Sequence, residues 1–243
     1  MTILRAIAGR FDDQEVALAQ TFADQAVIAI QNARLFRETN EALERQTATA
    51  EVLRVISESP TDVQPVLDAV AERAGILCHA DGSRVWLAEH GQLRAMTSYG
   101  PAYAGGAGIE ALPLRRTSIG GRAYLERRTI HVDDVLPLME SEYPDIREIQ
   151  QRYGFRTVLN VPLLREGEAL GVISLFRDEV RPFAPAEVRL LQTFADQAVI
   201  AIQNVRLFNE TREALERQTA TARILSAMSG SITDARPVFE ADG

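Results

Sequence analysis

The stretch "FRTVLNVPLLREGEALGVISLFRDEVRPFAPAEVRLLQTFADQAVIAIQNVRLF" runs from Phe155 to Phe208 and decides the fold. Its first part contains two strand-like segments, "RTVLNVPLL" and "EALGVISLFR", on either side of Glu166-Gly167, a pattern that predicts an antiparallel hairpin. The part after Pro182 has apolar residues at three- and four-residue spacing and a proline at its start, which predicts a long helix. A hairpin that leads into a helix favours the α+β class.

Thirty residues of this helix occur twice in the chain. The segment from Thr193 to Ala222 is nearly identical to the segment from Thr21 to Ala50, 193 − 21 = 172 positions earlier. The three differences are Ala33/Val205, Arg37/Asn209 and Asn40/Arg212. Near the end of the chain, "SITDARPVFEA" also repeats the earlier "SPTDVQPVLDA". A repeat of this length indicates an array of similar domains.

The repeat predicts five regions. Residues 1–35 are the end of one domain, residues 36–57 a helical linker, residues 58–208 a complete domain, residues 209–229 a second linker, and residues 230–243 the start of another domain. Within the complete domain, the pattern predicts a helix over residues 60–80, a hairpin around Gly91, a helix after Ser118, the strand "TIHV" and an irregular helical stretch over residues 133–153. This order predicts a mostly antiparallel sheet covered by helices.

Composition narrows the classes of partner. With 26 basic and 34 acidic residues, the net charge of −8 argues against a broad surface for nucleic acid or an anionic membrane. The apolar runs are far shorter than the ~20 residues that a membrane helix needs. A lone Cys78 cannot form a disulfide framework or a thiolate metal site. We therefore expect a cytoplasmic protein with no membrane contact in this segment.

The long helix has more apolar residues than one stripe requires. One face carries Leu191, Ala195, Ala198, Ile202 and Val205, and another carries Phe194, Ala201 and Phe208. Because one sheet covers only one face, we expect the second face to meet a second helix in a homodimer. Further on, the residues at seven-residue spacing predict a short parallel coiled coil, with an ordinary solvated linker helix as the alternative. The expected dimer residues are Phe194, Ala201, Phe208, Leu215 and Leu225.

Over Ser59 to Phe208 the chain resembles a GAF domain, and the quoted stretch is the most characteristic part of that resemblance. The resemblance implies a PAS-related six-stranded antiparallel sheet with helices on both faces, a ligand pocket on one face and long helical linkers at each end. The segment "RLFxETxEALERQTATAxxL" is similar to linkers in bacterial sensor histidine kinases with several GAF domains. The resemblance thus implies a sensory and dimerising module, whose kinase domain would lie outside this chain.

The family binds cyclic nucleotides, haem, tetrapyrroles or small metabolites, and many members have no known ligand, so the resemblance leaves the ligand and cofactor unknown. Trp86, Met96, Tyr124 and Tyr153 are candidates to line an apolar pocket, or are plain core residues. His131, in "TIHVDD", is a candidate haem or ligand contact next to that pocket, or a structural histidine. No second residue is spaced to complete a non-haem metal site.

Gly120 and Gly121 begin a predicted helix, whose free N–H groups could bind an anion with help from Arg122. The alternative is that glycine permits close packing of the helix on the sheet. The Asn-Lys and Phe-Asp-Glu signature of cyclic-nucleotide-binding GAF domains does not occur. The sequence also shows no catalytic motif, so we expect no enzyme in this segment. Two other functions stay open, namely a structural spacer that binds no ligand and a haem-based redox or gas sensor.

Overall fold

The computed structural model of the chain describes residues 12–58, 61–101 and 111–233. The chain forms two compact units, Met1–Ala50 and Glu51–Gly243. The first unit consists of most of helix α1 (Asp13–Glu58), which begins with a capping box: the N–H of Asp12 donates to the Glu15 carboxylate and the N–H of Glu15 donates to that of Asp12. The large apolar side chains of this helix from Val16 to Leu43 are exposed, and the side chain of Phe22 is 55% exposed.

The second unit is built on one six-stranded antiparallel sheet with the strand order β3-β2-β1-β6-β5-β4. The strands are β1 (Gly82–Glu89), β2 (Gln92–Tyr99), β3 (Ala111–Pro113), β4 (Ile130–Val132), β5 (Thr157–Arg165) and β6 (Glu168–Arg177). Glu166 and Gly167 both have positive φ, as a two-residue hairpin turn with the twist of the strands requires. The predicted sheet and its β5–β6 hairpin are confirmed.

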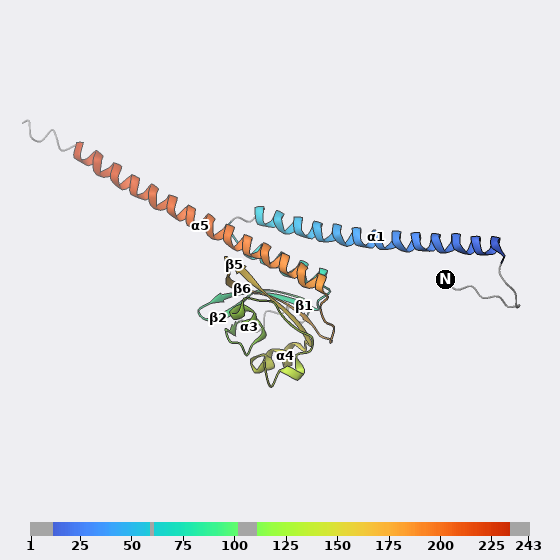
Figure 1. Cartoon of the computed structure of the whole chain (residues 1–243). Coiled ribbons are helices and arrows are strands. Elements are labelled where there is room, and N and C mark those ends of the chain that lie inside the picture. The colour runs from blue at the N-terminus through green and yellow to red at the C-terminus, as the bar shows by residue number, and fades with distance from the viewer. Residues whose placement is uncertain (1–11, 59–60, 102–110, 234–243) are drawn as a thin grey trace, which may run out of the picture. The chain divides into compact units, whose positions relative to one another are not determined.

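Helices cover both faces of this sheet (Figure 1). On one face lie α2 (Gln64–Leu77) and α5 (Pro185–Thr233), which also pack against each other. On the other lie α3 (Ile119–Glu126), the 3-10 helices η1 (Leu136–Leu138) and η2 (Pro144–Ile146), and α4 (Arg147–Tyr153). The stretch predicted as irregular helix over residues 133–153 is therefore two 3-10 turns and one short α-helix, because Pro137 and Pro144 interrupt it.

Alternation along β5 and β6 divides the core into two layers. Val158, Val172 and Phe176 belong to the apolar cluster under α3 and α4. Leu159 and Ile173 are equally buried but point to the opposite face, where α2 and α5 lie. The same two strands thus contact both helical layers.

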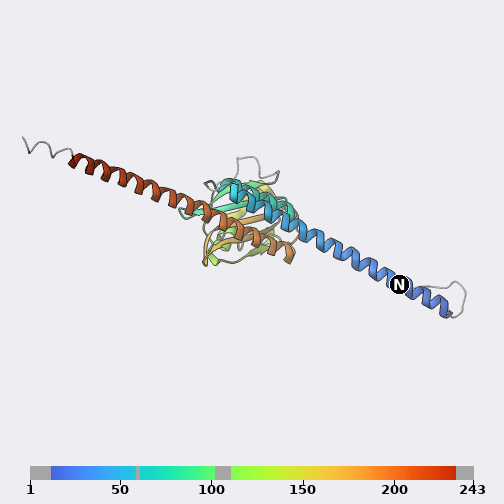
Figure 2. The same cartoon turned by 90° about the horizontal axis from the view of Figure 1, so that it is seen from above.

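The burial of α5 corrects one expectation. Phe194 is 0% exposed and Ala201 is also buried within a single copy of the chain, because α2 of the same domain supplies the second helix. Neither residue is available to a partner chain. Phe208 and Leu215 are exposed, the latter 63%, and Leu225 lies outside the residues whose side chains are described. Figure 2 shows α5 crossing the sheet and continuing beyond it.

The start of α5 is held by Arg177, the last residue of β6, whose side chain is 1% exposed. Its guanidinium donates to the carbonyl oxygens of Cys78, His79, Arg181 and Pro182 and to the carboxylate of Glu187. It also lies 3.8 Å from the ring centre of Phe183. Burial lowers the pKa of Arg177, and the negative charge of Glu187 opposes this shift. Arg177 therefore ties β6, the end of α2 and the first turn of α5 together.

None of the helices in the described residues combines the length and apolar character that would let it cross a membrane.

Candidate functional site

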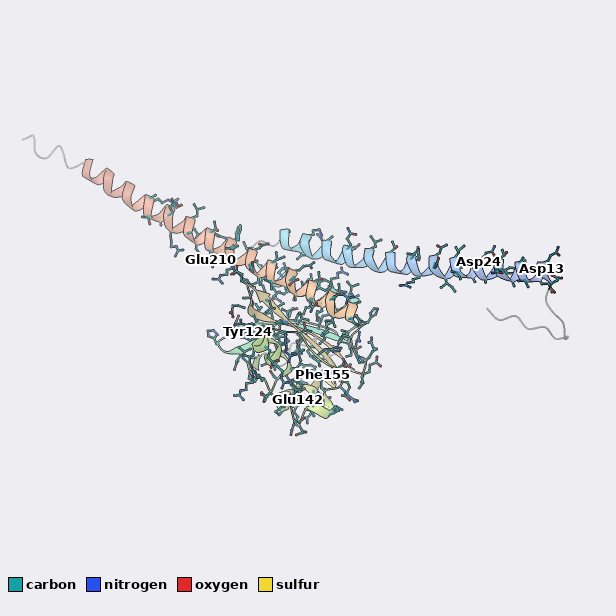
Figure 3. All side chains as sticks on the ribbon, in the orientation of Figure 1. Asp13, Asp24, Tyr124, Glu142, Phe155 and Glu210 are labelled. Carbon is teal, nitrogen blue, oxygen red and sulfur yellow. The ribbon has the colours of Figure 1, made fainter. Side chains whose placement is uncertain are left out.

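A cavity of about 30 Å³ lies between the sheet and the layer of α3 and α4. Its walls are Trp86, Leu112, Ser118, Ile119, Gly120, Ile146, Ile149, Phe155, Val158, Asn160, Ser174 and Phe176. Phe155 marks this side of the sheet in Figure 3. A water molecule needs roughly 10–15 Å³ of such volume, so the cavity has room for one or two waters and a larger ligand must displace part of the wall.

Three strands place a polar chain in the floor of this cavity. The indole N–H of Trp86, on β1, donates to Ser174 Oγ on β6 at 3.1 Å. The hydroxyl of Ser174 donates to Asn160 Oδ1 on β5 at 2.5 Å. Asn160 and Ser174 are directly opposite in the β5–β6 register and hence share one face. Neither residue was predicted from the sequence, although each is a polar position inside an otherwise apolar strand.

The first turn of α3 closes another wall. Ser118 is the N-cap residue, and its Oγ accepts the N–H of Gly121 at 3.0 Å, so this N–H is not available to the anion that the sequence suggested. A Cβ on Gly121 would lie 2.3 Å from the carbonyl oxygen of Arg115, which explains the glycine by close packing. Gly120 does line the cavity, and a Cβ there would meet only Leu93 and Asn160 at ordinary contact distances.

Arg122 points away from the cavity. Its guanidinium pairs with the carboxylate of Glu142 at 2.9 Å and stacks on the ring of Tyr143, with 4.4 Å to the ring centre. Both partners lie in the segment between η1 and η2. Arg122 thus fixes the outer layer, and nothing in its position supports the anion site.

Of the four residues predicted to line an apolar pocket, only one lies in the cavity wall. Trp86 lines the cavity, whereas Tyr124 and Tyr153 pack against the apolar cluster behind it. Tyr153 Oη also accepts a hydrogen bond from Arg84 at 2.9 Å. Met96 is the extra residue of a bulge between β1 and β2, so it leaves the alternation and is absent from the cavity wall.

His131 lies on the wrong face for the predicted pocket contact. Its neighbours Ile130 and Val132 point into the α3 layer, so alternation along β4 directs His131 toward α5. There its Nε2 accepts the N–H of Phe183 at 3.1 Å, and the two rings lie 5.7 Å apart. The structure therefore gives His131 a role at the β6–α5 connection.

The partly buried position of His131 makes the free energy of unfolding depend on pH. Burial lowers the pKa of His131 from 6.5, and Asp133, 3.5 Å from its Nε2, opposes the shift. Between the native pKa and 6.5 the unfolded chain binds more protons, so stability present above pH 6.5 is lost as the pH falls through that window. We expect His131→Gln, whose amide oxygen can accept the Phe183 N–H without titrating, to lessen this loss. Urea unfolding at several pH values measures it, and parallel curves for the two proteins would contradict the assignment.

Cys78 lies on the α5 face, at the end of α2, and is fully buried. Burial raises the pKa of its thiol to about 12, with a smaller contribution from the charge of Glu187. The thiol is therefore protonated at neutral pH and is a poor nucleophile. In the described part of the chain, no three His, Cys, Asp or Glu side chains are grouped to hold a metal ion.

The sequence model of the GAF domain family matches residues 62–202, more than half of the chain. The chain belongs to the GAF domain family. The matched region contains the whole sheet and the cavity, and it ends within the buried part of α5.

Solved structures share the GAF fold at low sequence identity. The GAF domain of a phosphoenolpyruvate-protein phosphotransferase from Coxiella burnetii is 20% identical, with a TM-score of 0.59, over 70% of this chain and 98% of that one. Free methionine-R-sulfoxide reductase from Neisseria meningitidis is 20% identical, with a TM-score of 0.56, over 69% and 93%. A domain of a putative two-component sensor histidine kinase from Sinorhizobium meliloti is 19% identical, with a TM-score of 0.51, over 62% and 97%.

Proposed function

We propose that this GAF domain is a sensory module in which a small molecule in the cavity alters the packing of α5 on the other side of the sheet. One observation carries the proposal: neighbouring residues of the same strands serve the two sites. Asn160 and Ser174 face the cavity, and Leu159 and Ile173 face α5. A ligand that shifts β5 or β6 therefore changes the surface under the helix, provided that it binds one arrangement better than the other.

The output is α5 itself, which continues as a helix to Thr233. Ile200, Leu207, Phe208 and Leu215 form an exposed apolar stripe along it. Charge pairs such as Arg206–Glu210 support the helix beyond the sheet. We propose that this stripe joins two copies in a parallel homodimer, with Phe208 and Leu215 retained from the sequence prediction.

The setting is a cytoplasmic bacterial signalling protein, most specifically a sensor histidine kinase with several GAF domains. Two neighbours support this setting, a domain of a two-component sensor histidine kinase and a methyl-accepting chemotaxis protein. The repeated helix supports the array. Phe22 in α1 repeats Phe194 of α5 yet is 55% exposed, so we propose that residues 1–35 are the C-terminal part of a preceding GAF domain, whose terminal helix includes Phe22.

The other functions gain no support from the site. The described lining residues include no histidine, cysteine or methionine to serve as an axial haem ligand, and His131 lies on the other face. A reaction that needs a reactive thiolate gains no support either, because Cys78 is buried and its raised pKa keeps the thiol protonated at neutral pH. The alternative function is a structural spacer that binds no ligand. A spacer could also dimerise through α5, but it would show no coupling between the cavity and this helix.

Cross-linking tests the dimer, because the buried Cys78 gives little background. In a parallel dimer, Leu207→Cys and Leu215→Cys each meet their own copy, so we expect disulfide-linked dimers of both variants. Glu213→Cys, exposed on the opposite side of α5, is the control and should stay unlinked. Equal linking at all three sites, or a monomer by sedimentation, would refute the model.

The coupling between the two faces needs a second measurement. Gly120→Ala adds one methyl group to the cavity without a close contact. We expect it to change the rate of cross-linking at Leu207, on the far side of the sheet. Unchanged rates in a folded Gly120→Ala variant would leave the dimer but remove the sensory coupling.

A further inference from the structure

The polar chain under the cavity begins at the indole N–H of Trp86. An indole N–H can only donate, so Ser174 Oγ accepts from Trp86 and has its own hydrogen left to donate. In the structure that hydrogen goes to the carbonyl oxygen of Asn160, Oδ1. The NH2 group of Asn160 is consequently turned away from Ser174.

This NH2 group is the unused polar group of the cavity. Asn160 is only 2% exposed and lines the cavity, and in the described residues its NH2 donates no hydrogen bond. The other polar groups are engaged, since Ser174 has two partners and Ser118 Oγ accepts the Gly121 N–H and lies 3.3 Å from two carbonyl oxygens. The fully buried side-chain atoms without a partner do not include this nitrogen, so the NH2 group stays accessible, and an acceptor in the cavity would give it a hydrogen bond.

The walls restrict what carries that acceptor. Apart from Ser118, Asn160 and Ser174, the described lining residues are apolar, and no lining residue is charged. A carboxylate or phosphate would lose its hydration without gaining a counter-charge. The small volume favours a compact molecule that moves the first turn of α3 only slightly.

We propose that the ligand is a small uncharged molecule with an apolar body and a carbonyl-type oxygen, and that Asn160 recognises that oxygen through its NH2 group. This inference rests on the proposed sensory function and names the ligand class of its cavity. Trp86 is linked to the ligand through Ser174 and Asn160.

Two probes of the same shape test the proposal in the full chain. Cyclopentanone carries the acceptor, and methylenecyclopentane replaces its oxygen by CH2. Titrations followed by NMR of the labelled Asn160 side-chain amide should show the ketone binding about three- to tenfold more tightly, the factor that one neutral hydrogen bond supplies. The ketone should shift the NH2 signals of Asn160 and the alkene should not.

Variants sharpen the outcome. Asn160→Leu should bind both probes equally, and Gly120→Ala, which fills part of the cavity, should weaken both in parallel. The signal of the wild-type NH2 group decides the question if Asn160→Leu does not fold. The proposal is overturned if the wild type binds both probes with equal affinity. It is also overturned if the ketone leaves the NH2 signals of Asn160 unchanged, which is expected if a water molecule stays bound to this group. If one of these two results is found while Leu207→Cys still forms disulfide-linked dimers, the proposed ligand class is refuted and the proposed dimer is not.

Discussion

Phe194→Ala is expected to lower the free energy of unfolding of the GAF domain by about 3–5 kcal/mol, the cost of removing a fully buried phenylalanine ring. Phe194 is 0% exposed, on the helix α5 that packs against both α2 and the sheet. Urea unfolding measures the effect, and the fluorescence of Trp86, the one tryptophan in the chain, reports directly on the domain core.

The chain contains its own control for this prediction. Phe22 occupies the same place in the repeat, in the identical segment "TFADQAVIAIQN", but its ring is largely exposed. Phe22→Ala should therefore change the unfolding of the domain by less than about 0.5 kcal/mol. Because helix propensity is the same at both sites, the difference measures packing alone. A loss below about 1 kcal/mol for Phe194→Ala would contradict the burial of α5 by its own domain.

The same helix shows how far sequence reasoning reaches. Its spacing correctly indicated two buried faces, because the apolar residues cover more than one stripe of the helix. It could not name the partner, since α2 and a helix of a second chain would leave the same pattern in α5. The mistake about Phe194 and Ala201 came from counting only one sheet and omitting a helix more than 100 residues earlier.

The cavity was harder to predict than the sheet. The turn at Glu166-Gly167 fixes the β5–β6 register, which places Asn160 beside Ser174, but single polar residues in apolar strands give only a weak signal. His131 had the stronger chemical signal and lies on the wrong face. Strand β4 has only three residues, so its sequence does not show which face of the sheet His131 occupies unless the burial of Ile130 and Val132 is known.

Arg177→Met is expected to destabilise the GAF domain by about 3–5 kcal/mol, because it removes one partner of a buried ion pair and leaves Glu187 without its counter-charge. The backbone carbonyl oxygens of Cys78, Arg181 and Pro182 lose this donor as well, whereas that of His79 keeps the guanidinium of Arg181. The matched control is Arg181→Met. Arg181 is about half exposed, pairs with Glu179 and donates to the carbonyl oxygen of His79, which Arg177 also contacts, so its loss should cost less than about 1 kcal/mol.

Urea unfolding gives the two free energies, and hydrogen exchange in the first turn of α5 shows where the loss occurs. Similar stability of the two variants would mean that Arg177 contributes no more than a surface residue. The expected difference bears on signalling, because β6 carries Ser174 at the cavity and ends at Arg177 beside α5. If this residue transmits strand movement to the helix, Glu187→Gln, which keeps a hydrogen-bond acceptor but removes the charge, should loosen the first turn of α5 and reduce the effect of Gly120→Ala on cross-linking at Leu207. An undiminished effect in a folded Glu187→Gln variant would place the coupling in the direct packing of β5 and β6 on α5.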